Sequence, residues 1–332
     1  MAPNVLVTGS AGHLGTALML ALPSHGLTPL GIDILPSKAP SLIGSIADRA
    51  FVSSIFEANP SITRIIHAAT LHKPHVESHS KSDFVETNIQ GTLVLLEEAA
   101  RVGIQSFIFV STTSTFGKAL SPGEGKPAAW IDEDVVPVPK NIYGVTKVAS
   151  EDLSKLVHMQ TGMPVLVLRT SRFFPEEDDD EDRRSEMGDE NLKVLELCYR
   201  RADIADVVSA CACASKRAGE IGWGKYIVSA PPPFKRDEAV LARLNNDAER
   251  VIKNIVPACE GVFRDKGWKF LGRMDRVYDS SKAVRELGWE PEYTFEKTIE
   301  RIGKGEEWRS DLTFKVGKRG YHAVSTGVYT VR

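Results

Sequence analysis

The sequence predicts an α/β protein built on a doubly wound parallel sheet, and three observations support this prediction. Short runs rich in β-branched residues alternate with longer helical patterns as far as about Thr170. A glycine-rich turn joins the first run to the first helical pattern, and the alternation weakens after Thr170. Because alternating strands and helices connect through right-handed crossovers, the helices are expected to cover both faces of a mostly parallel sheet.

Strands and helices are expected to alternate in the following order. The strands are predicted at 4–9, 28–33, 63–70, 106–112 and 164–170, and the helices at 13–22, 47–59, 82–103 and 143–162. Pro23 ends the first helix, Asp48 can cap the second, and Gly103 closes the third. Residues 118–140 are expected to form a loop over a site. The charge-dense residues 175–190 are expected to form a solvated loop.

Composition excludes several classes of function. The chain has 332 residues and a formal net charge of −3, so it lacks the basic footprint of a protein that binds nucleic acid or an anionic membrane. No targeting segment or membrane span is expected, because the apolar stretch before Pro23 is too short. The four cysteines lack metal-site spacing. We expect them to be reduced thiols of a cytoplasmic protein.

The turn after the first strand has the spacing of a dinucleotide-binding loop. Gly9, Gly12 and Gly15, with His13 and Leu14 between the last two, lie between a strand and a helix. Glycine there permits a tight turn and a close approach of backbone to a pyrophosphate, which the helix N-terminus attracts. Asp33 closes the second strand, where a carboxylate would accept hydrogen bonds from ribose hydroxyls and repel a 2′-phosphate. The pattern therefore predicts a Rossmann-type fold that binds NAD rather than NADP.

A second motif, Tyr143-x-x-x-Lys147, together with Gly-x-x-Gly-x-x-Gly, resembles the extended short-chain dehydrogenases/reductases. More narrowly, the chain is similar to the NAD-dependent epimerase/dehydratase family. The resemblance covers residues 4 to about 170 and continues weakly through 201–208 and 280–291. It implies an NAD-binding domain over 1–170 that carries the catalytic residues. It also implies a lobe over 171–332 that mainly binds substrate and is interleaved with the sheet edge.

The resemblance also implies roles for individual residues. Ser45 and Ile46 fall where the family contacts adenine, although the family usually has aspartate at the position of Ser45. Ala68, Ala69 and Thr70 would line the cofactor, and Asn88 would support the active-site backbone. Thr112 would be the catalytic hydroxyl, with Ser111 as second choice.

The chemistry explains why a tyrosine and a lysine lie four residues apart. Tyrosine titrates near pH ~10, which is too high for a base at neutral pH. On one helical face, Lys147 could bind the nicotinamide ribose and, with the positive nicotinamide ring, lower the pKa of Tyr143. Thr112 would hold the substrate oxygen. The sequence thus predicts an NAD-dependent oxidoreductase or epimerase that acts on a secondary alcohol or carbonyl.

The substrate is expected to be small, polar and sugar-like or anionic. Dehydratases of the family carry an Asp-Glu pair where this chain has Thr113 and Ser114, so dehydration of a sugar nucleotide is not expected. Arg172 stands where sugar-nucleotide members have asparagine, and a guanidinium suits a carboxylate or phosphate. Arg172 could equally pair with the acidic run 176–182. Arg200 and Arg201 are weaker candidates for the same role, and Thr113 would also face the substrate.

Alternatives to this function remain open at the level of the sequence. One is a simple carbonyl reductase or alcohol dehydrogenase with a non-sugar substrate, and another is a non-catalytic protein that senses a dinucleotide. His72, His75 and His79 match no standard ligand spacing, so no metal is expected, although His72 could line the cleft. By analogy with the family, the chain is expected to form a homodimer through the helices at 81–103 and 143–161.

Overall fold

The computed structural model describes residues 2–37, 39–123, 125–178 and 181–317. Its centre is a seven-stranded sheet in the order β10-β7-β5-β4-β1-β2-β3, and every neighbouring pair is parallel. The strands are β1 (Val5–Thr8), β2 (Pro29–Asp33), β3 (Ser41–Ile43), β4 (Arg64–His67), β5 (Ser106–Thr112), β7 (Val165–Thr170) and β10 (Trp223–Val228). This confirms the predicted fold class.

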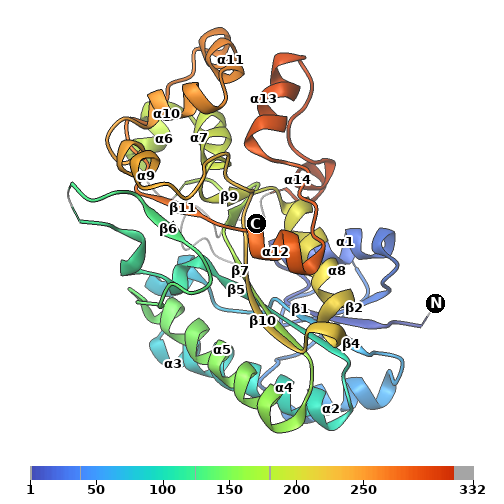
Figure 1. The fold of residues 1–332 in the computed structure, drawn as a ribbon. Helices are drawn as coiled ribbons and strands as arrows, with labels where there is room; N and C mark the ends of the chain where they lie inside the picture. Colours follow the sequence, from blue (N-terminus) through green and yellow to red (C-terminus); the bar gives the residue numbers. More distant parts are fainter. Residues whose placement is uncertain (1, 38, 124, 179–180, 318–332) are drawn as a thin grey trace.

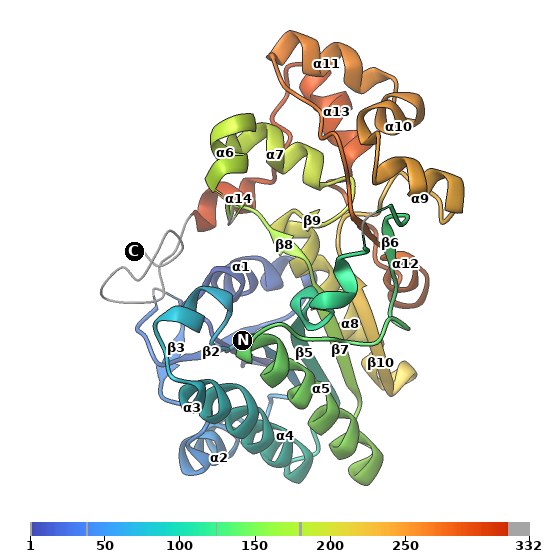
Figure 2. The ribbon, with the colours of Figure 1, turned by 90° about the vertical axis from the view of Figure 1, so that its left-hand side faces the viewer.

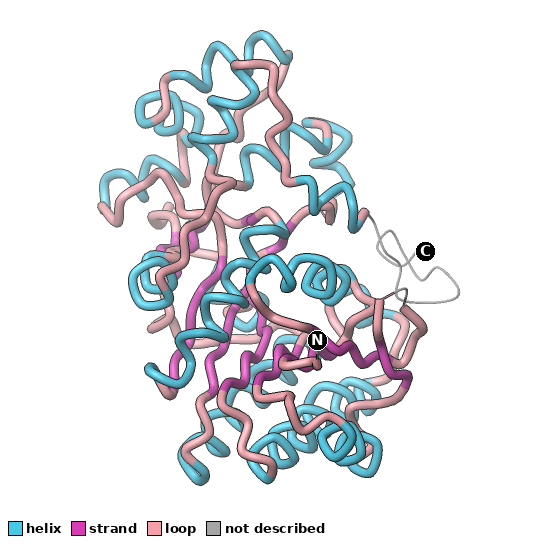
Figure 3. The backbone as a smooth tube through the Cα atoms, turned by 90° about the vertical axis from the view of Figure 1, so that its right-hand side faces the viewer, coloured by secondary structure: helices cyan, strands magenta, loops and turns pink. Residues whose placement is uncertain are grey.

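Helices cover both faces of the sheet (Figures 1 and 3). One layer contains α1 (His13–Ala21), extended by η1 (Leu22–His25), and α8 (Ile204–Ile221); the other contains α2 (Arg49–Ala58), α4 (Gly91–Arg101) and α5 (Ile142–Thr161). In β1, Val5 and Val7 pack toward α1 and α8, whereas Leu6 packs toward α2 and α4. Alternate residues of a strand thus enter two different cores, which is why the strand is apolar throughout.

The helix predicted over 82–103 differs from the observed structure. The segment begins as α3 (Lys81–Phe84), widens into the π-helical η3 (Val85–Gln90) and continues as α4. Single π-helical turns within α-helices often occur at functional sites. Here the π-helical turn contains Asn88, one of the residues expected to support the active site.

The loop expected over 118–140 contains a short helix, η5 (Lys118–Leu120), and the strand β6 (Ala129–Ile131). Strand β6 pairs with β11 (Arg276–Tyr278), and a second small sheet joins β8 (Arg172–Phe173) to β9 (Arg201–Ala202). The remaining 3₁₀ helices are η2 (Lys73–Glu77) and η4 (Thr113–Thr115). Both small sheets pair segments that are far apart in the sequence.

A second group of helices packs around its own apolar core beyond the large sheet (Figure 2). These helices are α6 (Glu181–Met187), α7 (Asp189–Glu196), α9 (Glu238–Leu244), α10 (Ala248–Ile255), α11 (Ala258–Lys266) and α13 (Phe295–Gly303). The chain also returns to the large sheet, through α8, β10, α12 (Ser281–Leu287) and α14 (Asp311–Val316). It therefore passes between the two parts of the molecule several times.

The expectation of a loop over 175–190 is wrong for the described residues of that stretch, although α6 has no buried residue and is solvated as expected. They include α6 and the start of α7, and Asp178 is only 4% exposed. The physical reason is that three arginines surround the Asp178 carboxylate, one from α6 of the same stretch and two from outside it. Residues 179 and 180 of the acidic run lie outside the described residues.

Candidate functional site

A cavity of about 540 Å³ opens where β1, β4, β5 and β7 end, which is where ligands of such sheets bind. The predicted residues that line it are Gly9, Gly12, His13, Leu14, Gly15, Ala68, Thr70, Thr112, Thr113, Tyr143 and Arg172. Those that do not are Asp33, Ser45, Ile46, Ala69, Asn88 and Lys147. Most of the predicted site thus gathers around one cavity, and the remainder lies behind its walls or beside it.

The glycine loop at one end of this cavity has the geometry that a dinucleotide requires. Gly9 has a φ of +72°, and a Cβ atom there would lie 2.8 Å from the backbone of Ala69. A Cβ atom at Gly15 would lie 1.9 Å from the carbonyl oxygen of Gly9. Helix α1 begins at His13, and its first turn lines the cavity. The glycine loop therefore brings the N–H groups of a helix terminus to the cavity, so the residues present fit a dinucleotide phosphate.

Asp33 lies beside the glycine loop at the end of β2. Its carboxylate accepts hydrogen bonds from the backbone N–H of Ala11 and of Leu35, both at 2.9 Å. Asp33 thereby holds the loop against the second strand, a role additional to the predicted contact with ribose.

The two residues expected near adenine lie apart from the cavity. Ser45 is exposed, and its hydroxyl accepts a hydrogen bond from the N–H of Ala47. Ile46 is buried in the core beneath α2 and α4 and packs against Gly91. Neither is brought to the glycine loop by a contact in the structure.

A buried histidine that sequence reasoning did not select organises the strand ends. His67 Nδ1 is 2.7 Å from Thr8 Oγ1, and His67 Nε2 is 2.9 Å from Thr92 Oγ1. Burial, assisted by the charge of Lys147, lowers the pKa of His67 to about 3, so the ring is neutral at physiological pH. Thr8 Oγ1 also accepts hydrogen bonds from the N–H groups of Ala68 and Ala69. This network holds the β4 end that faces the glycine loop.

Asn88 joins the same strand end to α5. Its amide group donates to the Leu71 carbonyl oxygen and to Thr146 Oγ1, and its side-chain oxygen accepts from the Leu71 N–H and the Thr70 hydroxyl, at 2.8–3.0 Å. The π-helical turn at Asn88 thus faces both the β4 end and the helix that carries Tyr143 and Lys147.

The structure distinguishes the two candidate hydroxyls at the end of β5. Ser111 donates to the buried Glu151 carboxylate at 2.7 Å. Thr112 Oγ1 instead accepts from the Ser114 N–H, and Thr112, as a hydrogen-bond partner, offsets part of the rise that burial causes in the pKa of Tyr143. The geometry therefore favours Thr112 over Ser111 as the partner of Tyr143 in the cavity.

Burial, rather than the neighbouring lysine, dominates the pKa of Tyr143. Burial raises this pKa, and the hydrogen bond with Thr112 opposes the rise only in part. Lys147 Nζ lies over the Phe109 ring and donates to the Val110 carbonyl oxygen at 2.7 Å. Burial also lowers the pKa of Lys147 to about 7, against the attraction of Glu151. In the protein alone, the causes of the shift in the pKa of Tyr143 are burial, Thr112 and Glu176. The effect expected of Lys147 together with the nicotinamide ring stays a prediction.

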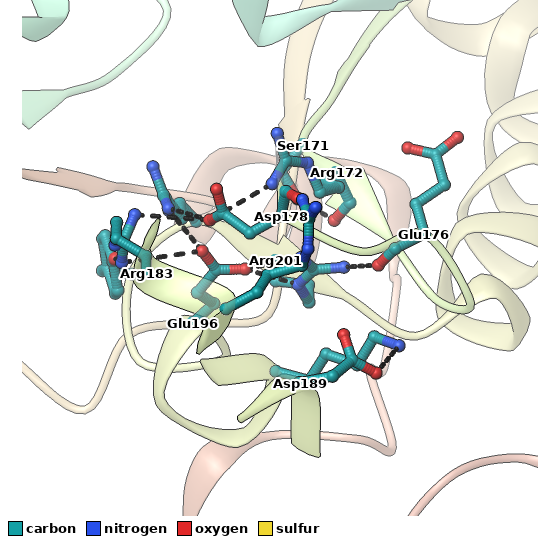
Figure 4. Close-up of polar contacts among 12 residues, drawn as sticks. Ser171, Arg172, Glu176, Asp178, Arg183, Asp189, Glu196 and Arg201 are labelled. Atoms are coloured by element: carbon teal, nitrogen blue, oxygen red, sulfur yellow. Dashed lines mark hydrogen bonds and ion pairs between the residues drawn. The ribbon is translucent and has the colours of Figure 1, made fainter. Parts of the chain in front are cut away.

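Charged side chains also line the cavity, and sequence reasoning missed most of them (Figure 4). Arg172 lines the cavity and also pairs with Asp178 at 3.3 Å, so both of its predicted roles are compatible with its position. Arg200 lines the cavity, whereas Arg201 does not. The additional charged lining residues are Lys73, Lys140, Glu176, Asp178, Arg183, Glu196 and Arg276. No motif marks them, and the density of charge in 175–190 is a signal for Glu176, Asp178 and Arg183 alone.

The histidines after β4 form a small structural cluster. His75 Nδ1 accepts the N–H of His72 at 2.8 Å, and the His75 ring packs edge-on against the rings of His72 and His79. His72 lines the cavity as expected. Within the described parts of the chain, no three His, Cys, Asp or Glu side chains gather as a metal ion would require. In the same parts, no helix has the length and apolarity needed to cross a bilayer.

Comparison with known proteins identifies the family. The model of the NAD dependent epimerase/dehydratase family matches residues 5–190. UDP-glucose 4-epimerase of Rhizobium meliloti (strain 1021) is 25% identical, over 87% of this chain and 93% of its own length. dTDP-glucose 4,6-dehydratase of Xanthomonas campestris pv. campestris (strain B100) is 28% identical, over 89% of this chain and 90% of its own.

Solved structures share the fold. A short-chain dehydrogenase/reductase superfamily protein from Agrobacterium tumefaciens, crystallised with bound NAD, superposes with a TM-score of 0.62 at 19% identity. The match covers 90% of this chain and 96% of that one. Together with the glycine loop and the Tyr143–Lys147 motif, the family match shows that the chain belongs to the NAD-dependent epimerase/dehydratase family of extended short-chain dehydrogenases/reductases and is an NAD-dependent enzyme.

Proposed function

We propose that this enzyme interconverts a secondary alcohol and a carbonyl on a small polar, sugar-like or anionic substrate, with Tyr143 as the acid and base. NAD supplies the hydride chemistry and, in its oxidised form, a positive ring. The observation that carries the proposal is that Thr112 and Tyr143 line the same cavity as the glycine loop. Membership of an enzyme family leaves no reason to retain the non-catalytic alternative.

Different residues of the site would have different roles in the reaction. Tyr143 would move the proton at the substrate oxygen, and Thr112 would hold that oxygen by donating a hydrogen bond. Lys147, four residues along the same helix, would bind the nicotinamide ribose with its ammonium and favour the phenolate. Because burial raises the pKa of Tyr143 in the protein alone, positive charge at the cofactor would be needed to bring that pKa toward neutrality.

The relatives favour a sugar-like substrate. They are named as epimerases of UDP-glucose and a dehydratase of dTDP-glucose. Thr113 and Ser114 replace the acid pair of the dehydratases, so we propose epimerisation or simple oxidoreduction rather than dehydration. A carbonyl reductase or alcohol dehydrogenase remains the second candidate, because Arg172 replaces the asparagine of sugar-nucleotide members. We further propose a cytoplasmic location, since all four cysteines are free thiols.

Substitution of Tyr143 tests the catalytic assignment. Tyr143→Phe should lower kcat by ~10²–10⁴-fold, because the proton transfer is lost, while NAD affinity measured by calorimetry stays close to the wild-type value. Tyr278→Phe is a matched control, because it removes another phenol hydroxyl from the same cavity. It should keep kcat near the wild-type value. Full activity of Tyr143→Phe would disprove the assignment.

Cofactor turnover separates the two candidate reactions. An epimerase regenerates its NAD in each cycle and shows no net change in the near-ultraviolet absorbance of NADH, whereas a reductase or dehydrogenase consumes the cofactor stoichiometrically. We expect no net change on a nucleotide sugar. A stoichiometric change would favour the second candidate.

A further inference from the structure

Three arginines that line the cavity converge on one carboxylate oxygen (Figure 4). Asp178 Oδ2 lies 2.6 Å from Arg200 Nη2, and 3.3 Å from both Arg172 Nη1 and Arg183 Nη1. The preferred separation for a guanidinium and a carboxylate is about 2.7–2.9 Å. Two of the three contacts are thus longer than a directly bonded, bidentate pair would make them.

Arg172, Arg183 and Arg200 line the cavity, whereas Arg169 and Arg201, which also pair with carboxylates, do not. Arg276, paired with Asp275, lines the cavity as well. Arg169 and Glu151 are sealed in the core at 2% and 0% side-chain exposure, and Arg201 and Glu196 at 0% and 1%. The side chains of Arg172, Arg183 and Arg200 are 22%, 27% and 19% exposed, and all three line the cavity. Pairs that only stabilise the fold have no need to open onto a ligand cavity.

The buried ion pair between Arg201 and Glu196 supports the exposed arginines. Glu196 Oε2 accepts from Arg201 Nε at 2.7 Å, and Glu196 Oε1 accepts from Arg200 Nε at 2.9 Å. Although burial opposes it, the charges of Arg201 and Arg200 hold the pKa of Glu196 well below its usual range, so this carboxylate stays ionised. Arg200 therefore keeps a partner whether or not Asp178 is in contact with it.

Asp178 is attached differently from Glu196. Glu196 ends helix α7, whereas residues 176–178 belong to no helix or strand. A change in the position of the Asp178 side chain would therefore disrupt no regular element. Strand β7 ends at Thr170, and Arg172 lies two residues further along the chain. Thr170 is paired in register with Thr112 on β5. A ligand held by Arg172 would thus extend toward the Thr112–Tyr143 pair.

From this geometry we propose that Arg172, Arg183 and Arg200 form a subsite for an anionic oxygen group of the substrate, a carboxylate or a phosphate, and that Asp178 holds the subsite until the substrate replaces it. The inference rests on the proposed function for the identity of the cavity. Asp178 acts as a tethered competitor, because a carboxylate on the same chain has a high effective concentration at the arginines. The apparent affinity for the substrate falls by the fraction of molecules in which Asp178 occupies the subsite. Asp178 is thus a specificity-determining residue.

Direct binding to the NAD-saturated enzyme tests this inference without requiring turnover. Calorimetry would use three probes: UDP for phosphate, glucuronate for carboxylate, and glucose as a neutral reference. Asp178→Asn should bind at least one anion about five- to tenfold more tightly than the wild type, with glucose unchanged, since the competitor is lost. Whether UDP or glucuronate gains identifies the group. Arg172→Gln should bind the same anion at least about tenfold more weakly, through the loss of one charge-assisted contact.

Asp182→Asn is the matched control, because it makes the same change at an exposed position on α6. It should leave the binding of all three probes unchanged. Asp178→Asn that binds neither anion more tightly, or Asp182→Asn that gains as much, would overturn the inference. If Asp178→Asn does not fold, as judged by its melting temperature and NAD binding, wild-type anion affinity in Arg172→Gln would overturn it. Full activity of Tyr143→Phe would instead refute the proposed function and leave this binding pattern intact.

Discussion

Lys147 links the chemistry of the site to the stability of the fold. Burial lowers its pKa to about 7 from its ordinary 10.5, so between these values the unfolded chain binds more protons than the folded chain. Stability must then rise with pH across this window and be lost as the pH falls toward 7. Relative to Lys147→Met, the free energy of unfolding of the wild type should rise by up to about 1.4 kcal/mol per pH unit. Urea denaturation at several pH values measures this difference.

An exposed lysine of the same helix serves as the control. Lys155→Met makes an identical change on α5 without altering a buried charge. The difference between Lys155→Met and the wild type should stay flat across the window. A flat profile for Lys147→Met as well would show that the ammonium is better solvated than its burial implies.

Asp33 should set the choice between NAD and NADP. Its carboxylate is predicted to accept from the ribose hydroxyls and already accepts from the glycine loop. Asp33→Ala should weaken NAD about tenfold, the value of a hydrogen bond to a charged group, and weaken NADP less because a repulsive charge is removed. Asp48→Ala, which removes the N-cap of α2, should lower stability by ~1 kcal/mol and leave cofactor preference unchanged. An unchanged preference in Asp33→Ala would contradict the prediction.

At the scale of elements, the β1–α1 turn depends on a glycine that packs against another glycine. A methyl group at Gly15 would overlap the Gly9 carbonyl oxygen, which belongs to backbone that cannot rotate away. Gly15→Ala should therefore lower the free energy of unfolding by ~3 kcal/mol and weaken NAD binding. Denaturation and calorimetry measure the two effects.

Gly219 provides the comparison. It lies in α8 with nothing within 4 Å of an added Cβ atom, so Gly219→Ala should stabilise the helix by up to ~1 kcal/mol and leave NAD binding unchanged. If Gly15→Ala and Gly219→Ala have the same free energy of unfolding and NAD affinity, the turn tolerates a side chain. The close approach of Gly15 to Gly9 would then not be required.

The elements predicted from sequence are those with strong local signals. Strand β1, the glycine turn and α1, and the helix of Tyr143 and Lys147, combine clear periodicity with glycine or capping residues at their ends. Strands β3 and β10 were not predicted. Strand β3 has three residues, and β10 joins the sheet only because α8 returns the chain to β7. Pairings of this kind are decided by tertiary packing, which a local pattern does not carry.

The residues of the site, like the elements, could be predicted only where a local pattern in the sequence marks them. Motif residues such as Gly15 and Tyr143 were found because their chemistry imposes spacing along the chain. Arg172 and Arg200 were candidates, but the convergence of three arginines on Asp178 was missed because they come from β8, α6 and the turn before β9. Asp178 itself lies in a run whose composition alone indicates a solvated loop.

For the whole molecule, the surface of α4 and α5 suggests how two copies would associate. These helices pack side by side on one face of the sheet (Figure 1). Along α5, Val145, Leu156 and Met159 share one side of the helix and are 50%, 47% and 70% exposed. Apolar side chains grouped on one surface are typical of a protein–protein interface. We therefore predict a two-fold symmetric dimer through α4 and α5, in which both copies bury the same residues of this face.

Charge on this face should dissociate the dimer and leave the cavity intact. In the double variant Leu156→Asp, Met159→Asp, the loss of apolar burial in both copies should raise the dimer dissociation constant at least ~100-fold, about 2.7 kcal/mol. Sedimentation velocity would report a monomer, and calorimetry would report unchanged NAD binding, because neither residue lines the cavity. Val136→Asp, at a 73% exposed position between β6 and α5, is the control and should remain dimeric. A wild type that sediments as a monomer at every concentration would refute the dimer itself. A double variant that stays dimeric would place the interface on another face.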